Sequence, residues 1–191
     1  MLRINKAYGM RIVGPNCLLI MRPPVNLNAT FLRENPEKGN IAFISDVGSF
    51  CRTLLDWGMS SHIGFSMVVS LGSSIDVDFG DVIDFLFEDP HTKSIILYME
   101  DVVGDVKRFV SAVRCFARSK PIILLKPPIL EDGDCAGLTH TGAMAGPEKV
   151  YDALFRRLGV VRVREVQPEG KKRLPAADFI NGLRLKAGQT L

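Results

Sequence analysis

The sequence is poor in the residues that mark several classes of protein. Its 191 residues include one tryptophan, three tyrosines, three histidines and four cysteines. No apolar run approaches the ~20 residues that a membrane-spanning helix needs, and residues 1–6 lack the apolar centre of a signal peptide. We therefore expect a cytoplasmic protein with no membrane partner.

Neither the cysteines nor the charges indicate a metal site or a nucleic-acid site. Cys17, Cys51, Cys115 and Cys135 show no CxxC spacing and no histidine at the spacing of zinc ligands. The net charge is only +3, and apart from Lys171–Arg173 the basic residues are spread along the chain without interleaved aromatic residues. We expect reduced thiols, no bound metal and no nucleic-acid partner.

The chain does contain a regular alternation of two apolar patterns. Hydrophobic residues make up 47% of it and charged residues 24%, which is typical of globular proteins. Nearly continuous β-branched runs predict buried strands at Ile41–Ile44, Phe65–Val69, Ser94–Tyr98, Ile122–Leu125 and Val160–Val163. Apolar stripes at helical spacing predict helices around residues 50–57, 79–86, 106–116 and 150–158. This order predicts a mostly parallel α/β sheet, wound on both faces, over residues 39–165.

The two flanking segments are less regular. Arg11–Val13 predicts one more strand, and residues 22–38 form an irregular stretch rich in proline and asparagine. Because a lone strand cannot build a core, we expect residues 1–38 to be the end of a neighbouring domain. We expect residues 166–191 to form a tail.

Ligands of an open parallel sheet bind at the carboxyl ends of its strands, and several candidate groups follow the predicted strands. Gly48 and Ser49 can offer backbone N–H groups to a phosphate, or form an ordinary turn in which Ser49 caps a helix. Glu100 can orient a histidine, or is a solvated loop acid. His140 can carry a phosphoryl group, or lies on a surface loop. Cys17 can lie near a thiol or acyl ligand, or is a small packing residue.

Six separated motifs occur in the order in which one family has them. They are Tyr8–Cys17, Leu27–Phe31, Leu54–Trp57, Val69–Gly72, Asp76–Asp81 and His140–Gly146. Together they resemble the NDP-forming acyl-CoA synthetases, relatives of the succinyl-CoA synthetase α subunit. That family includes acetate–CoA ligases and the related domains of protein lysine acetyltransferases. The resemblance covers residues 1 to about 165.

The resemblance implies a division of the chain into parts. Residues 1–38 would be the C-terminal fragment of a Rossmann-like CoA-binding domain. Residues 39–165 would be the flavodoxin-like succinyl-CoA-ligase domain, a doubly wound parallel sheet. Residues 166–191 fall outside the family pattern.

The resemblance also implies a reaction and the residues that serve it. Acyl-CoA, phosphate and a nucleoside diphosphate would give acid, CoA and a nucleoside triphosphate. His140 would accept the phosphoryl group and Glu100 would hold that histidine. Phosphate would bind at Val47-Gly48-Ser49, and CoA at Gly14-Pro15-Asn16-Cys17. ATP or ADP, with Mg²⁺, would bind to a partner, an ATP-grasp domain or a β-type subunit, so the chain alone would not turn over. Assembly into a homo-oligomer stays open.

One departure from the family pattern favours a different function. The family usually reads Gln-Ser-Gly where this chain has Asp46-Val47-Gly48. Two like charges ~4 Å apart repel by roughly 4 kcal/mol at an effective dielectric constant of about 20, so Asp46 opposes a phosphate unless it turns away. The alternative is a non-catalytic regulatory or interaction domain, a remnant of a protein lysine acetyltransferase. The sequence specifies neither the acid nor the nucleotide.

Overall fold

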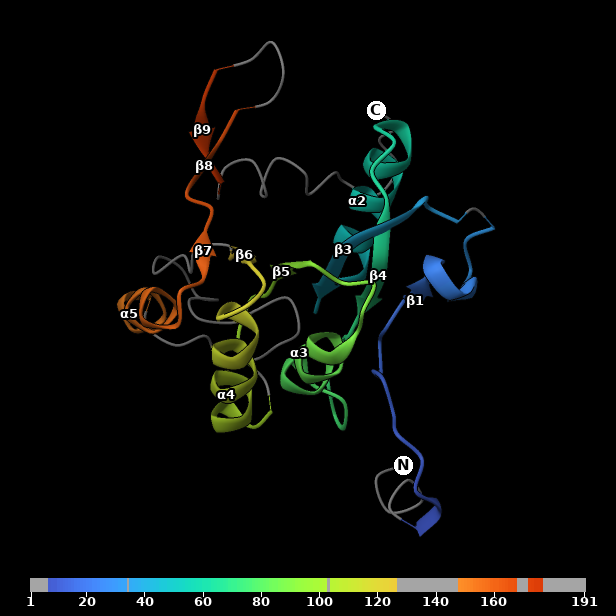
Figure 1. The fold of residues 1–191 in the computed structure, drawn as a ribbon, viewed down its shortest axis with the longest axis horizontal. Coiled ribbons are helices and arrows are strands. Elements are labelled where there is room, and N and C mark those ends of the chain that lie inside the picture. The colour runs from blue at the N-terminus through green and yellow to red at the C-terminus, as the bar shows by residue number, and fades with distance from the viewer. Residues whose placement is uncertain (1–6, 34, 103, 127–147, 168–171, 177–191) are drawn as a thin grey trace, which may run out of the picture.

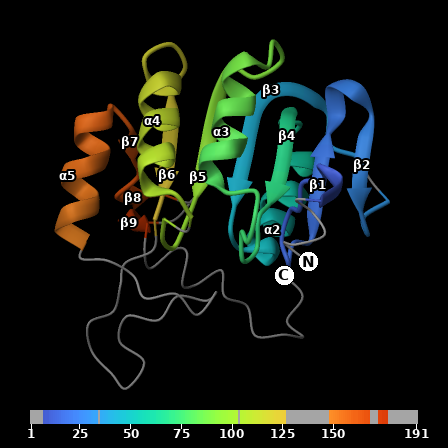
Figure 2. The same ribbon diagram turned by 90° about the horizontal axis from the view of Figure 1, so that it is seen from below.

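The structure is a computed structural model that describes residues 7–33, 35–102, 104–126, 148–167 and 172–176. Within them, a seven-stranded sheet has the strand order β2-β1-β4-β3-β5-β6-β7 (Figures 1 and 2). The strands are β1 Leu19–Arg22, β2 Leu27–Thr30, β3 Lys38–Ser45, β4 Phe65–Ser70, β5 Ser94–Tyr98, β6 Ile122–Leu125 and β7 Val161–Arg162. The helices are η1 Pro23–Val25, α2 Gly48–Ser60, α3 Phe79–Glu88, α4 Val106–Ala117 and α5 Glu148–Leu158.

The five strands predicted from the β-branched runs form the parallel part of this sheet. β3 pairs with β4 and β5, β5 pairs with β6, and β6 pairs with β7, all in parallel. Numbered from β3, these strands have the spatial order 2-1-3-4-5, which is the flavodoxin-like order of doubly wound sheets. All six residues of β4 are buried, as expected for a strand covered on both faces. The predicted fold class is confirmed.

An antiparallel hairpin extends the sheet at one edge. β1 pairs with β2, and Ile20 of β1 lies opposite Val69 of β4. The prediction of irregular chain over residues 22–38 was therefore wrong for β2. Its residues alternate between exposed and half-buried, so they carry too little apolar signal to predict a strand.

The predicted strand at Arg11–Val13 was also wrong, because these residues lie outside the strands of the sheet. The segment is instead fixed to the loop before α3. The Val77 N–H donates to the Ile12 carbonyl at 3.1 Å, and the Ile12 N–H donates to the Asp76 carboxylate at 2.7 Å. Because these residues pair with no strand of the described sheet, their β-branched side chains indicate only an extended segment.

Helices cover both faces of the sheet. Neighbouring residues of a strand point to opposite faces, so Ala42 and Ile44 join one apolar core whereas Phe43 joins the other. The first core includes residues of α3, α4 and α5, and the second includes Cys51 and Leu55 of α2. Figure 2 shows α3, α4 and α5 side by side on one face and α2 behind the sheet. The four predicted helices are all present.

Aspartate side chains fix where α3 and α4 begin. Asp78 accepts the Asp81 N–H at 3.0 Å while Asp81 accepts the Asp78 N–H at 3.2 Å, which forms a capping box. Asp105 accepts the N–H groups of Lys107 and Arg108 at 2.9 and 3.2 Å. These contacts satisfy first-turn N–H groups that have no partner inside the helix.

A small separate element follows the sheet. β8 Glu165–Val166 and β9 Leu174–Pro175 pair antiparallel, and the Ala176 N–H donates to the Arg164 carbonyl at 2.7 Å. Two-residue strands are too short for any apolar period, which is why the sequence predicted only a tail here.

Candidate active site

The carboxyl ends of the parallel strands lie in register along one edge of the sheet. Ser45 of β3 is opposite Ser70 of β4 and Tyr98 of β5, and Tyr98 is opposite Leu125 of β6. The chain leaves β3 toward α2 on one face and enters β5 from α3 on the other. The topological switch point therefore falls between β3 and β5, which is where open α/β sheets bind their ligands.

Asp46 follows β3 directly at this point and is buried. Its side chain is one of the few buried charged groups, with 4% of the residue exposed. Oδ2 accepts the backbone N–H of Glu100 at 2.8 Å, whereas Oδ1 is buried with no hydrogen-bond partner in the described part of the chain. Asp46 thus joins the ends of β3 and β5 and does not turn out to solvent.

Burial raises the pKa of Asp46 from 3.8 to about 7, because the charged form loses its hydration. The negative charge of Glu100 acts in the same direction. The hydrogen bond from the Glu100 N–H and the positive charge of Lys126 act in the opposite direction. A large share of Asp46 is therefore neutral at pH 7, which weakens the repulsion that the sequence predicted between Asp46 and a phosphate.

The predicted phosphate-binding residues form the N-terminus of α2. Val47 is the N-cap, and its side chain makes no capping hydrogen bond. The first turn of the helix contains no acidic residue. The Val47 N–H is bound to the Ser45 hydroxyl at 2.9 Å, and Ser49 is exposed. The first turn of a 13-residue helix, beginning at Gly48, thus presents its N–H groups beside Asp46. The alternative in which Ser49 caps the helix is not what the structure shows.

Glu100, the predicted holder of His140, follows β5 and is buried with 5% of the residue exposed. Its backbone carbonyl accepts a hydrogen bond from Nζ of Lys126, the residue that follows β6 and is 3% exposed. Glu100 is therefore not a solvated loop acid. His140 itself lies outside the described residues, so its contact with Glu100 stays a prediction.

Lys126 is a site residue that the sequence analysis missed. Its Nζ lies 4.5 Å from the ring centroid of Tyr151 in α5, and the Tyr151 hydroxyl donates to the Asp101 carboxylate. These contacts place a buried positive charge at the same edge of the sheet as Asp46. A lysine directly after a buried parallel strand was the available signal.

The predicted CoA loop, Gly14-Pro15-Asn16-Cys17, reaches this edge from the other side. The Ser73 N–H donates to the Pro15 carbonyl at 2.9 Å, and the Ile75 N–H donates to the Gly14 carbonyl at 3.1 Å. Gly72 has a φ of +57°, and a Cβ there would lie 2.2 Å from the Pro15 oxygen. Only glycine fits this close approach of the loop after β4 to the predicted CoA loop.

Leu18, the residue after the predicted CoA loop, packs against the start of α2. The Leu18 N–H donates to the Ser70 hydroxyl at 2.7 Å, and a Cβ on Gly48 would lie 2.6 Å from the Leu18 side chain. Cys17 is half-buried, and its Sγ donates to the Val13 carbonyl at 3.4 Å. The structure thus brings the predicted CoA loop, the predicted phosphate loop and Glu100 to one edge.

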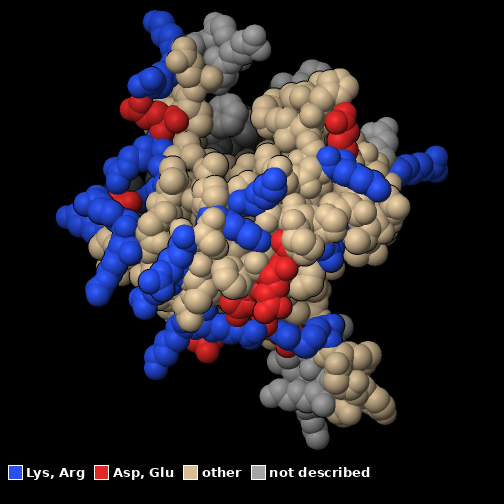
Figure 3. All heavy atoms as spheres, in the orientation of Figure 1, with Lys and Arg blue, Asp and Glu red and all other residues tan. Residues whose placement is uncertain are grey.

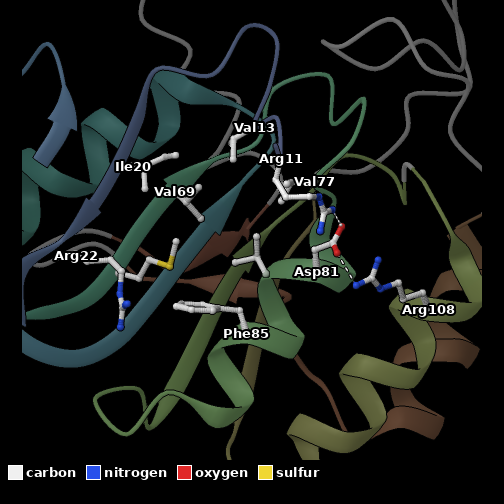
Figure 4. Close-up of a pocket in the computed structure, with 11 residues that line it drawn as sticks. Arg11, Val13, Ile20, Arg22, Val69, Val77, Asp81, Phe85 and Arg108 are labelled. Atoms are coloured by element: carbon white, nitrogen blue, oxygen red, sulfur yellow. Dashed lines mark hydrogen bonds and ion pairs between the residues drawn. The ribbon is translucent and has the colours of Figure 1, made fainter. Parts of the chain in front are cut away.

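A hollow lies on the sheet face beside α3 (Figure 4). It has a volume of 410 Å³, and its charged rim is internally paired: Asp81 contacts Arg11 at 3.0 Å and Arg108 at 2.5 Å. Arg22 on the same rim pairs with Asp89 at 2.9 Å. Its apolar lining consists of Val13, Ile20, Met67, Val69, Val77, Val82 and Phe85. No sequence pattern indicated this hollow, because its residues come from distant segments.

Basic residues that are spread along the sequence gather on the side of the molecule that carries α4 and α5 (Figure 3). Arg156 and Arg157 are exposed in the last turn of α5. Asp152 of that helix pairs with Arg162 and, at 3.2 Å, with Arg164. This basic side carries no aromatic stripe of the kind that binds single-stranded nucleic acid among its described residues.

Comparison with known proteins agrees with the fold. Residues 38–168 match the family described as the succinyl-CoA ligase like flavodoxin domain. The chain belongs to this family.

Several relatives of this succinyl-CoA ligase like domain have named activities. The chain is 38% identical, over 87% of its length, to acetate–CoA ligase [ADP-forming] I of Archaeoglobus fulgidus. It is 40% identical, over 84% of its length, to the α subunit of acetate–CoA ligase [ADP-forming] II of Pyrococcus furiosus. The match spans only 24% of the first relative and 35% of the second.

Solved structures support the same relationship. Acetyl-coenzyme A synthetase 1 of Ca. Korarchaeum cryptofilum, solved in complex with phosphate and ADP, matches with a TM-score of 0.78 at 35% identity. That match covers 86% of this chain and 36% of the other. In the described part of this chain, no helix is long and apolar enough to span a membrane, and no three His, Cys, Asp or Glu side chains are placed to hold a metal ion.

Proposed function

We propose that this chain is the acyl-CoA- and phosphate-handling part of an ADP-forming acid–CoA ligase. A phosphate oxygen attacks the thioester carbonyl, the CoA thiolate leaves, and acyl phosphate forms. A neutral ring nitrogen of His140 then attacks phosphorus and the carboxylic acid leaves. The phosphoryl group finally passes from His140 to ADP, with Mg²⁺, on a partner chain of the ATP-grasp or β-type subunit class.

The observation that carries this proposal is the meeting of three predicted segments at one sheet edge. Gly14–Cys17 is bonded to the loop after β4, and Leu18 packs against Gly48 at the start of α2. Asp46, just before α2, is bonded to Glu100 after β5. A thioester held by the loop and a phosphate at α2 would thus be neighbours. Proximity of this kind lowers the barrier of a bimolecular step, because the reacting groups no longer lose translational and rotational freedom when they meet.

Phosphoryl transfer to His140 tests the proposal. The full chain is incubated with radiolabelled ATP, Mg²⁺ and an active ATP-grasp partner chain, and acid-labile label on the chain is measured. We expect label on the parent, none on His140→Ala and unchanged label on His91→Ala, because His91 lies before β5 at the opposite end of the sheet. Without the partner we expect no label.

Glu100→Gln refines the same test. If Glu100 orients His140, this variant is labelled more slowly and its rate depends differently on pH, because the neutral amide no longer stabilises the imidazolium. Should neither the parent nor Asp46→Asn take up label with an active partner, the ligase assignment is wrong. The non-catalytic regulatory or interaction domain is then the function that remains.

A further inference from the structure

Asp46 has one carboxyl oxygen that accepts a hydrogen bond within the described part of the fold and one that has no hydrogen-bond partner there. Oδ2 accepts the Glu100 N–H at 2.8 Å, and Oδ1 is buried without a partner in the described residues. A buried polar atom without a partner is rare in folded proteins, because it loses its hydration and gains nothing in return. Oδ1 therefore has an unmet need for a hydrogen-bond partner, which a group from outside the described residues can supply.

The bonding of Asp46 also decides where its proton sits in the neutral form. Oδ2 faces an N–H donor and must stay an acceptor, so the proton is on Oδ1. The neutral acid then offers an O–H donor at Oδ1, whereas the carboxylate offers a second acceptor there. The two protonation states hence prefer opposite kinds of ligand atom.

The N-terminus of α2 lies directly after Asp46 and has no side-chain cap, unlike the N-termini of the two helices that follow. Asp78 caps α3 and Asp105 caps α4, but no side chain caps α2 at Val47. The charge of Asp46 also reaches the first turn of α2, where it acts on the Cys51 thiol. First-turn N–H groups and an O–H on the adjacent Asp46 are both donors of the kind that bind a tetrahedral oxyanion.

We propose that protonation of Asp46 controls the binding of an oxyanion at the N-terminus of α2. The acid form donates a hydrogen bond from Oδ1 to the oxyanion, and the carboxylate form repels it. This inference rests on the phosphate site of the proposed function and adds its regulation. Binding of the oxyanion takes up one proton, so affinity falls as the pH rises.

The charges around Asp46 set the pH range of this control. Glu100 after β5 faces it with a negative charge, Lys126 after β6 with a positive one, and the Cys51 thiol of α2 is neutral because burial raises its pKa. Together with burial they place the pKa of Asp46 at about 7. Affinity for an oxyanion should hence fall about tenfold for each pH unit above that value.

Sulfate is the probe that tests the proposal, because unlike phosphate it does not change its charge between pH 5.5 and 8.5. The ¹⁵N-labelled full chain is titrated with sodium sulfate at constant ionic strength, and the amide signals of Gly48 and Ser49 report binding at α2. We expect affinity to fall at least tenfold from pH 5.5 to pH 8.5 in the parent. We expect no such fall in Asp46→Asn, whose amide accepts from Glu100 and donates to the anion at every pH.

Two controls separate this effect from general electrostatics. Asp56→Asn removes the same charge from an exposed position of α2, where Asp56 pairs with Arg52, and it should keep the pH dependence of the parent. The amides of Lys107 and Arg108 at the start of α4 are bonded to Asp105 and should not respond to sulfate. Displacement of sulfate by phosphate or by ADP at pH 5.5 tells a free anion from a nucleotide phosphate.

The results overturn the inference in two distinguishable ways. If sulfate binds at Gly48 and Ser49 but Asp46→Asn keeps the pH dependence, the control by Asp46 is wrong and the phosphate site stands. If sulfate moves neither signal in the parent at pH 5.5 or in Asp46→Asn, the phosphate site itself is wrong. Labelling of His140 is measured separately, so the two failures cannot be confused.

Discussion

The backbone N–H of Glu100 donates a 2.8 Å hydrogen bond to Oδ2 of Asp46, and this bond joins the ends of β3 and β5 at the topological switch point. It holds a carboxyl group inside the fold at the edge where open α/β sheets bind their ligands. The bond also explains why Asp46 stays buried although burial raises its pKa to about 7. Asp46 therefore both joins β3 to β5 and sets the charge at this edge of the sheet.

The raised pKa of Asp46 makes the stability of the protein depend on pH. A carboxyl group whose pKa rises from 3.8 in the unfolded chain to about 7 on folding stabilises the fold fully below pH 3.8 and loses this contribution as the pH rises to 7. Asp46→Asn removes the loss. We expect it to increase the free energy of unfolding at pH 8 by up to about 4 kcal/mol relative to its effect at pH 4.

Urea unfolding of the parent, Asp46→Asn and Asp56→Asn at pH 4 and pH 8 measures this difference. Asp56 is 56% exposed in its side chain, so its replacement should change stability little at either pH. An equal effect of Asp46→Asn at the two pH values would mean that Asp46 is ionised normally in the folded protein.

Lys126 should lower the pKa of Asp46, because its positive charge favours the carboxylate. In Lys126→Met we expect the pKa of Asp46 to rise further above 7, as followed by the carboxyl ¹³C signal during a pH titration. Lys120→Met is the matched control. Its Nζ also donates to backbone carbonyls, those of Leu86, Phe87 and Asp89 at 3.0–3.2 Å, but at the end of α3. An equal shift in both variants would contradict the assignment of Lys126 to the site.

The close approach of Gly72 to Pro15 predicts a large effect of a single methyl group. Gly72→Ala places a Cβ 2.2 Å from the Pro15 oxygen at a φ of +57°. Gly159→Ala has a similar φ of +76° with nothing within 4 Å of the new Cβ, so it reports backbone strain alone. We expect Gly72→Ala to lower the free energy of unfolding by about 1–3 kcal/mol more than Gly159→Ala. Equal losses would show that the predicted CoA loop is not fixed by the loop after β4.

Asp81 links three segments, since it completes the capping box of α3 and contacts both Arg11 and Arg108. Its side chain is 7% exposed, so Asp81→Ala leaves the Asp78 N–H without its acceptor, and Arg11 and Arg108 each lose one carboxylate partner. We expect a loss of roughly 2 kcal/mol in thermal or urea unfolding. Asp84→Ala on the same helix, with a half-exposed side chain 3.8 Å from Arg108, should cost less than about 0.5 kcal/mol. Similar losses in the two variants would mean that the contacts of Asp81 contribute little.

Much of the fold could be read from the sequence because the apolar patterns are strong. The runs at Phe65–Val69 and Ser94–Tyr98 become β4 and β5, since short, nearly continuous β-branched runs are typical of strands buried on both faces. β2 could not be found this way, because it lies at the edge of the sheet and buries no residue fully. Arg11–Val13 has the composition of a strand but no neighbour to pair with in the sheet.

The sequence by itself determined the helices, the parallel strands and several of the residues that stand at their carboxyl ends, because local patterns and chain order are enough for these. Only the tertiary structure decided which of these residues meet and what state they are in. It buries Asp46, bonds it to Glu100 and leaves Oδ1 without a partner, and it brings Lys126 and the loop at Gly14–Cys17 to the same edge. The physical reason is that the pKa of a side chain and the identity of its partner depend on burial and on distances in the folded protein. Asp46 and Glu100 are 54 residues apart in the chain, so no local pattern encodes either property.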